Sequence, residues 1–143
     1  MKIENIYPAN WQETRGVYSP AKKIDMGDYY LVFVSGQQAR KNNNNEVTSD
    51  IEQQTNEVFE SIEEILKSAG TGMNNIVKAV IYLTDMQEFK NFSSIRDKWF
   101  NDCKPVSTLV EVNGMTRKGA KVEIEVTALI KKWGKQWKNN LLE

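Results

Sequence analysis

The sequence predicts a single α+β domain in which two helices cover one face of a sheet. Residues 122–130 alternate apolar and polar side chains with a period of two, which is typical of a strand that buries one face. Residues 29–35 and 76–83 are nearly continuous apolar runs, as expected of strands inside a sheet. Two further stretches carry apolar residues at helical spacing and predict the helices.

The first part of the chain predicts an arm and two strands. Residues 1–16 are predicted to be an extended N-terminal arm. A short strand follows through Ile24, and a glycine turn leads into the apolar strand 29–35. Gly36 is expected to end that strand, and the run of asparagines after it is interpreted as a solvated loop.

The first helix is expected to begin at Ser49. Ser49 and Glu52 have the spacing of a capping box, in which the two side chains accept from otherwise unpaired backbone N–H groups. Apolar residues then recur at helical spacing until Gly70, which is placed to end the helix. The strand 76–83 comes next, so this region predicts a strand–helix–strand unit with parallel pairing.

The second helix is expected to be capped by Asp85 and to run through Phe100. Its aromatic residues are interpreted as core packing rather than as a base-stacking platform. Two strands follow within residues 105–130, a stretch that reads like a hairpin with Arg117 in its loop. The polar face of the second strand carries Glu123, so this stretch is predicted to form one wall of a polar cleft.

The composition predicts a cytoplasmic protein and gives no general sign of a nucleic-acid or membrane partner. Lys plus Arg and Asp plus Glu balance at 19 each in 143 residues, so nothing draws the whole chain toward nucleic acid. No apolar run approaches the roughly 20 residues that span a bilayer, and the N-terminus lacks the apolar core of a signal peptide. The one cysteine, Cys103, fits a reducing compartment.

The chain contains no histidine, which excludes several kinds of site. Ser-His-Asp and Cys-His nucleophile pairs and histidine metal ligands are all ruled out. Chemistry in this protein must rely on carboxylates, Arg, Lys, Tyr, Ser or backbone groups, and no metal is predicted.

Residues 131–143 are predicted to be a basic C-terminal tail. Lysines alternate there with Trp133 and Trp137, a composition that suits nucleic acid or a membrane surface. Four lysines carry little specificity, so the favoured interpretation is a tail that packs on its own domain or on a neighbouring subunit.

Five stretches follow one another with compatible spacing: YSPAKKIDMGDYYLVFVSGQ, DIEQQTNEVFESIEEILKSAG, IVKAVIYLTDMQEF, PVSTLVEV and KVEIEVTALI. Together they resemble the RidA/YjgF family of reactive-intermediate deaminases, also labelled endoribonuclease L-PSP or translation inhibitors. The resemblance covers about residues 17–130. It implies a chorismate-mutase-like (YjgF-like) α/β fold for the single domain 1–143, with a six-stranded mixed sheet and two helices on one face. It also implies a homotrimer with small-molecule clefts between subunits.

The resemblance implies a specific reaction and also an obstacle to it. Deaminase members hydrolyse enamines or imines to a 2-oxo acid and ammonia without a cofactor, so no cofactor is expected. In their P-x-R-[ST] motif the arginine clamps the substrate carboxylate. Here the motif reads Pro105-Val106-Ser107-Thr108, and a serine has neither the charge nor the fork of that arginine. Standard deaminase activity is therefore expected to be weak or absent.

Other positions of the family's cleft are matched or replaced in this sequence. Glu123 matches the carboxylate that is thought to hold the attacking water, and it is the one catalytic residue implied. Arg117 and Arg15 are the candidates for a substitute cation, although the simpler interpretation of Arg117 is an exposed loop charge. The remaining residues expected to line the ligand-binding cleft are Tyr18, Ser35, Gly36, Ser93, Ser107 and Leu109.

Three functions stay open at this point. The first is a homotrimer that binds a small ligand in its clefts and lacks the standard deaminase activity, which best fits the loss of the arginine. The second is an active enamine or imine deaminase, a hydrolase, with a different anchor. The third is an endoribonuclease that inhibits translation, as the family label implies, although no motif in the chain supports RNA as a partner.

Overall fold

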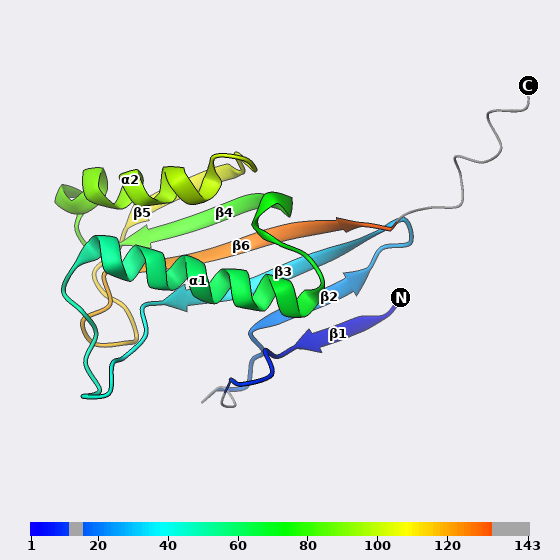
Figure 1. Cartoon of the computed structure of the whole chain (residues 1–143), viewed down its shortest axis with the longest axis horizontal. Coiled ribbons are helices and arrows are strands. Elements are labelled where there is room, and N and C mark those ends of the chain that lie inside the picture. The colour runs from blue at the N-terminus through cyan, green and yellow to red at the C-terminus, as the bar shows by residue number, and fades with distance from the viewer. Residues whose placement is uncertain (12–15, 133–143) are drawn as a thin grey trace, which may run out of the picture.

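Six strands form one sheet, and two helices lie on the same face of it (Figure 1). The computed structural model describes residues 1–11 and 16–132. The strands are β1 (Ile3–Ile6), β2 (Ala21–Asp25), β3 (Tyr29–Gln38), β4 (Ile76–Leu83), β5 (Val106–Glu111) and β6 (Val122–Lys131). The helices are α1 (Ile51–Ala69) and α2 (Phe89–Phe100), with short 3₁₀ turns at Met73–Asn75 and Met86–Glu88. The predicted fold class, a six-stranded mixed sheet with two helices on one face, is confirmed.

The order of strands in the sheet is β1-β2-β3-β6-β4-β5, so β5 and β6 are not neighbours. The hairpin expected in residues 105–130 is wrong, because β4 lies between these strands, parallel to β5 and antiparallel to β6. The connection 112–121 is long enough to pass the end of β4. The parallel pairing expected between strands 29–35 and 76–83 is also wrong, because β6 lies between β3 and β4 and pairs antiparallel with both. The strand–helix–strand unit is therefore a split one.

The predicted N-terminal arm contains one of the strands, β1. β1 pairs antiparallel with β2 at the edge of the sheet. Beyond it, Trp11 reaches α1, where its indole N–H donates to Glu64 at 2.8 Å. The arm is therefore fastened to both layers of the fold.

The core lies between the helices and one face of the sheet. In β6, Val122, Ile124, Val126 and Ala128 are buried and alternate with half-buried residues, as the period of two predicts. α1 and α2 meet through aromatic rings, since Phe59 stacks on Trp99 and meets Phe100 edge to face. The core-packing interpretation of the α2 aromatics is confirmed at these rings.

The first helix begins one residue later than expected. Asp50, not Ser49, is its N-cap, and its carboxylate accepts from the backbone N–H groups of Glu52 and Gln53. The carboxylate adds a charge at the positive end of the helix, which a serine hydroxyl does not supply. Gly70 ends the helix in the left-handed conformation with φ of 89°, as predicted.

The helix-free face of the sheet is partly apolar and exposed. Phe33 is 45% exposed and Val110 is 43% exposed on this face. Further apolar side chains share it by register, including Leu31, Val80 and Leu129. Leu109 is not on this face, because it pairs with Ile81 beneath the helices.

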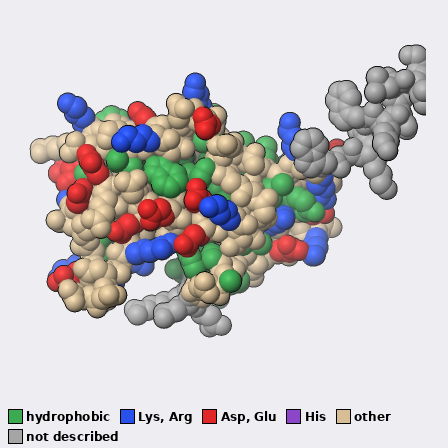
Figure 2. All heavy atoms as spheres, viewed as in Figure 1, with side chains coloured by type: hydrophobic (Ala, Val, Ile, Leu, Met, Phe, Trp, Pro, Cys, Tyr) green, Lys and Arg blue, Asp and Glu red, His purple; other side chains and the backbone are tan. Residues whose placement is uncertain are grey.

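The helix-covered face shows no patch of one charge. Acidic and basic side chains are interspersed over α1 and the loops around it (Figure 2). Among the described residues, no helix is long and apolar enough to cross a bilayer. The predicted basic tail begins with Lys131 and Lys132. Its remaining residues, 133–143, lie outside the described part of the chain.

We expect Gln54→Leu to destabilise the fold strongly. Gln54 is fully buried, its amide N–H groups donate to the carbonyls of Thr48 and Gly119 at 2.6 and 2.9 Å, and its oxygen accepts from the N–H of Lys121 at 2.8 Å. Leucine leaves three backbone groups unsatisfied, so the free energy of unfolding should fall by about 2–4 kcal/mol. Urea denaturation measures this, and the exposed Gln53→Leu is the control, with a change within about 0.5 kcal/mol.

Candidate functional site

The residues expected in the cleft lie on opposite faces of the sheet. Glu123 pairs with Tyr82 and projects from the helix-free face. Ser107 pairs with Ala79, which is buried under the helices, so Ser107 projects toward the helix side. Leu109 shares that side and packs against the core. One chain therefore does not gather these residues in a single cavity.

The first group of site residues gathers around β3. Gly36 lies against Glu123, because a Cβ built on Gly36 would be 2.9 Å from the carboxyl carbon of Glu123. The hydroxyl of Ser35 donates to the carbonyl oxygen of Ser19 at 2.8 Å. That bond ties β3 to the segment that carries Tyr18.

Glu123 is held by a residue that the sequence did not point to. The amide N–H of Gln38 donates to Oε1 of Glu123 at 2.8 Å and to the hydroxyl of Thr116 at 3.0 Å. The amide oxygen of Gln38 accepts from the backbone N–H of Arg117 at 3.1 Å. Alternation counted from Val34 would place Gln38 on the helix side, so the sequence pattern gave no signal for this contact.

A second acidic side chain follows Glu123 on the same face of β6. Glu125 accepts a hydrogen bond from the hydroxyl of Tyr82 at 3.2 Å. The charge of Glu125, followed by burial and that hydrogen bond, raises the pKa of Tyr82 above its usual value. Tyr82 is therefore a neutral hydrogen-bond donor beside the two carboxylates.

The second group of site residues lies on α2 and β5. Ser93 is half-buried on α2, and its hydroxyl donates to the carbonyl oxygen of Lys90 in its own helix at 3.0 Å. Ser107 is exposed on β5, the edge strand. Ser107 is therefore at an edge of the sheet and Ser93 is on a covering helix, both on the side of the sheet opposite Glu123.

Arg117, one of the two candidate cations, differs from the expectation of an exposed loop charge. A guanidinium N–H of Arg117 donates to the carbonyl oxygen of Ala39, so this side chain is anchored to the β3 end rather than left as a free loop charge. Within residues 1–11 and 16–132, no ion pair joins Arg117 to Glu123. Arg15 lies outside the described residues.

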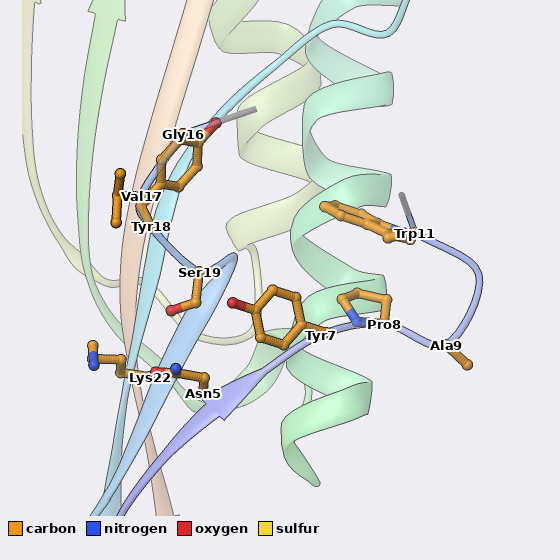
Figure 3. A pocket seen from close by; sticks show the side chains of 10 residues that line it. All are labelled: Asn5, Tyr7, Pro8, Ala9, Trp11, Gly16, Val17, Tyr18, Ser19 and Lys22. Carbon is orange, nitrogen blue, oxygen red and sulfur yellow. The ribbon is translucent and has the colours of Figure 1, made fainter. Parts of the chain in front are cut away.

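A groove of about 800 Å³ runs along the N-terminal arm (Figure 3). Its walls include the rings of Tyr7, Trp11 and Tyr18 and the side chain of Lys22. Of the described residues expected in the ligand cleft, Tyr18 is the one that lines this groove. The groove therefore adjoins the first group without including Glu123.

A second groove of about 930 Å³ lies at the C-terminal end of β6, the end opposite Glu123. Cys103 lines it together with Leu129 and Lys132. Burial raises the pKa of the Cys103 thiol, which leaves it a poor nucleophile. Cys103 is therefore an ordinary, partly buried cysteine.

We expect Gly36→Ala to displace the Glu123 side chain while the fold persists. The new Cβ would lie 2.9 Å from the Glu123 carboxyl carbon, which belongs to the flexible end of a side chain. The carboxylate should turn away, and the free energy of unfolding should fall by about 1 kcal/mol. A crystal structure and urea denaturation measure the two effects. Gly72→Ala, whose Cβ meets nothing within 4 Å, is the control; an unmoved Glu123 would contradict the expectation.

Comparison with known proteins gives consistent matches over most of the chain. The sequence profile of the family described as Endoribonuclease L-PSP matches residues 10–130. A RutC family protein of Pyrococcus horikoshii is 33% identical over 126 residues, which are 87% of this chain and 96% of that protein. The mitochondrial protein MMF1 of Saccharomyces cerevisiae is 32% identical over 114 residues, covering 80% of this chain and 75% of that protein.

Solved structures show the same relationship. The crystal structure of yeast Mmf1 superposes with a TM-score of 0.77 at 28% identity, over 92% of this chain and all (100%) of that chain. YyfA from Yersinia pestis, described as a protein of unknown function of the conserved Rid family, gives 0.76 at 31% identity, over 89% of this chain and 98% of that one. The chain therefore belongs to the RidA/YjgF family, whose profile carries the name endoribonuclease L-PSP.

Proposed function

We propose that this protein is a homotrimer that binds a small ligand in clefts between its subunits and lacks the standard enamine or imine deaminase activity of the family. The observation that carries the proposal is Ser107 at the position of the carboxylate-binding arginine. It is an exposed residue on an edge strand, with a short neutral side chain. It has no means of forming the bidentate ion pair that arginine makes with a carboxylate.

The described arginines support the loss of that clamp. Arg40 binds Glu64 and Ser61 of α1 at 2.9 and 3.0 Å. Arg96 pairs with its neighbour Asp97 at 2.9 Å. Arg117 is bound to a backbone carbonyl oxygen. In the part of the chain that the structure describes, each guanidinium is thus engaged within its own neighbourhood.

Two features support the trimer. The helix-free face exposes apolar side chains such as Phe33 and Val110, which a closed ring of subunits would bury. The two groups of candidate residues also lie on opposite faces of one chain. A cleft between subunits unites them if the β5 edge of one copy meets Glu123 of the next.

The charge of the cleft favours a particular kind of ligand. Glu123 and Glu125 bring two carboxylates to the helix-free face, and Ser107 brings no cation to offset them. Such a cleft should prefer a neutral or positively charged ligand over a carboxylate.

One observation favours deaminase activity as the second candidate function. Glu123, the implied water-positioning residue, is retained and is held by Gln38 at 2.8 Å. An active deaminase would then need an anchor other than an arginine at position 107. The ribonuclease hypothesis has no such support. Glu111 lies on the helix side of β5, so it does not join Glu123 and Glu125 in an acidic cluster that could hold a metal ion.

The subunit assembly is tested by measuring the mass of the purified protein in solution. Light scattering after gel filtration should give three times the subunit mass of 16.5 kDa. A monomer would overturn the proposal, because the two groups of site residues would then never meet.

The activity is tested with a pyridoxal-phosphate dehydratase that releases 2-aminoacrylate. Pyruvate formation should not accelerate when the unaltered protein is added. A large acceleration that disappears in Glu123→Ala would overturn the proposal in favour of the deaminase.

A further inference from the structure

β3 carries a bulge beside the candidate site. Val34 lies opposite Val126 and Gln37 lies opposite Ile124, so three steps along β3 match two steps along β6. An extra residue of this kind turns the side chains after it to the other face of the strand. Gln38 is therefore on the helix-free face, where regular alternation would have put it under the helices.

The hydrogen bonds of Gln38 fix how its amide is oriented. The backbone N–H of Arg117 is only a donor, so the amide atom 3.1 Å from it must be the oxygen. The amide nitrogen then faces Oε1 of Glu123 at 2.8 Å and the hydroxyl oxygen of Thr116 at 3.0 Å. The side chain is thus a bridge between the loop after β5 and the carboxylate on β6.

Two neighbours confine the Glu123 carboxylate at the same oxygen. Gln38 donates to Oε1 at 2.8 Å, and Gly36 lies so close that a Cβ there would be 3.1 Å from Oε1. Within the described residues, no hydrogen bond or ion pair reaches Oε2. Oε1 is therefore held by the protein, and Oε2 is available to accept a hydrogen bond from a ligand or water.

We infer that Gln38 is a positioning residue of the cleft: it holds one oxygen of Glu123 so that Oε2 accepts an N–H or O–H group of a bound ligand or water. The inference rests on the proposed function, in which Glu123 faces the cleft. It deepens that function by naming the ligand as a hydrogen-bond donor at this point. The bulge in β3 is what brings Gln38 to the site.

Two substitutions separate this role from a structural one. Gln38→Lys keeps a donor toward Glu123 but loses the acceptor for the Arg117 N–H. Gln38→Glu keeps that acceptor but places a second carboxylate against Glu123. If Gln38 positions Glu123, the lysine variant should resemble the unaltered protein and the glutamate variant should not. If Gln38 only holds the loop, the order should be reversed.

The first measurement is structural and needs no ligand. In crystals of the two variants, the Glu123 carboxylate should keep its place in Gln38→Lys and turn away in Gln38→Glu. A carboxylate that stays in place in both, or moves only in the lysine variant, would overturn the inference. Thr116→Val is the control, since it removes one bond of the bridge without touching Glu123 and should leave the carboxylate in place.

The second measurement is functional and uses Ser107→Arg as the background. Pyruvate release from 2-aminoacrylate should fall at least about tenfold on adding Gln38→Glu and stay within about threefold on adding Gln38→Lys. The reverse order would overturn the inference. An inactive Ser107→Arg background would count against the proposed function alone, because the crystal comparison still decides the role of Gln38.

Discussion

Ser107→Arg is expected to give the protein enamine and imine deaminase activity. In the proposed alignment, the substitution places a guanidinium where deaminase members of the family are expected to clamp the substrate carboxylate, while Glu123 is still held by Gln38. A bidentate pair with a carboxylate contributes about 1.5–3 kcal/mol, so pyruvate release from 2-aminoacrylate should rise by about 10- to 150-fold. Ser107 is exposed on an edge strand, so the larger side chain has room.

Two further variants decide what the gain means. Ser107→Lys supplies the charge without the fork and should recover less activity than arginine. Adding Glu123→Ala to Ser107→Arg should abolish the gain, since the water would lose its acceptor. If Ser107→Arg matched the unaltered protein, the alignment of this position with the family's arginine would be refuted.

Phe33→Glu is expected to break the proposed trimer into monomers. Phe33 is on β3, an inner strand of the sheet. Its side chain projects from the helix-free face and is 45% exposed in the single chain. In a closed ring this face would be buried, and an unpaired carboxylate buried there costs several kcal/mol at each interface. Light scattering should report the mass of one subunit, 16.5 kDa, instead of three.

A matched control separates assembly from folding. Gln53→Glu adds the same charge on the exposed surface of α1 and should leave the trimer intact. Far-UV circular dichroism of Phe33→Glu should stay native, because this side chain is outside the buried core. A variant that keeps three subunits would show that this face is not the interface.

The local patterns of the chain were enough to predict most of its elements. Regular alternation in β6 and the apolar run of β4 predicted two strands correctly, because burial of one or both faces leaves a direct trace in the sequence. Gly70 predicted the end of α1, because few other residues adopt its left-handed conformation. The start of α1 was predicted one residue too early, because Ser49 and Asp50 are neighbours that can both cap a helix and Asp50 does so.

Strand order was less accessible to sequence reasoning. Residues 105–130 read like a hairpin because two strands are joined by one loop. Strand pairing depends on contacts between distant parts of the chain, and here β4 occupies the place between β5 and β6. The strand in the N-terminal arm was missed for a similar reason, since four residues at a sheet edge carry too short a pattern.

The sequence by itself determined the family and the two-layer fold, and it predicted that Ser107 stands in place of the family's arginine. These follow from residue identity and from periodicity, which any chain displays before it folds. Only the tertiary structure decided which residues share a face of the sheet. One extra residue in β3 reverses the alternation after Val34 and brings Gln38 to Glu123, and the position of β4 puts Ser107 and Glu123 on opposite faces. Both outcomes depend on register between strands, a long-range property that local patterns do not encode.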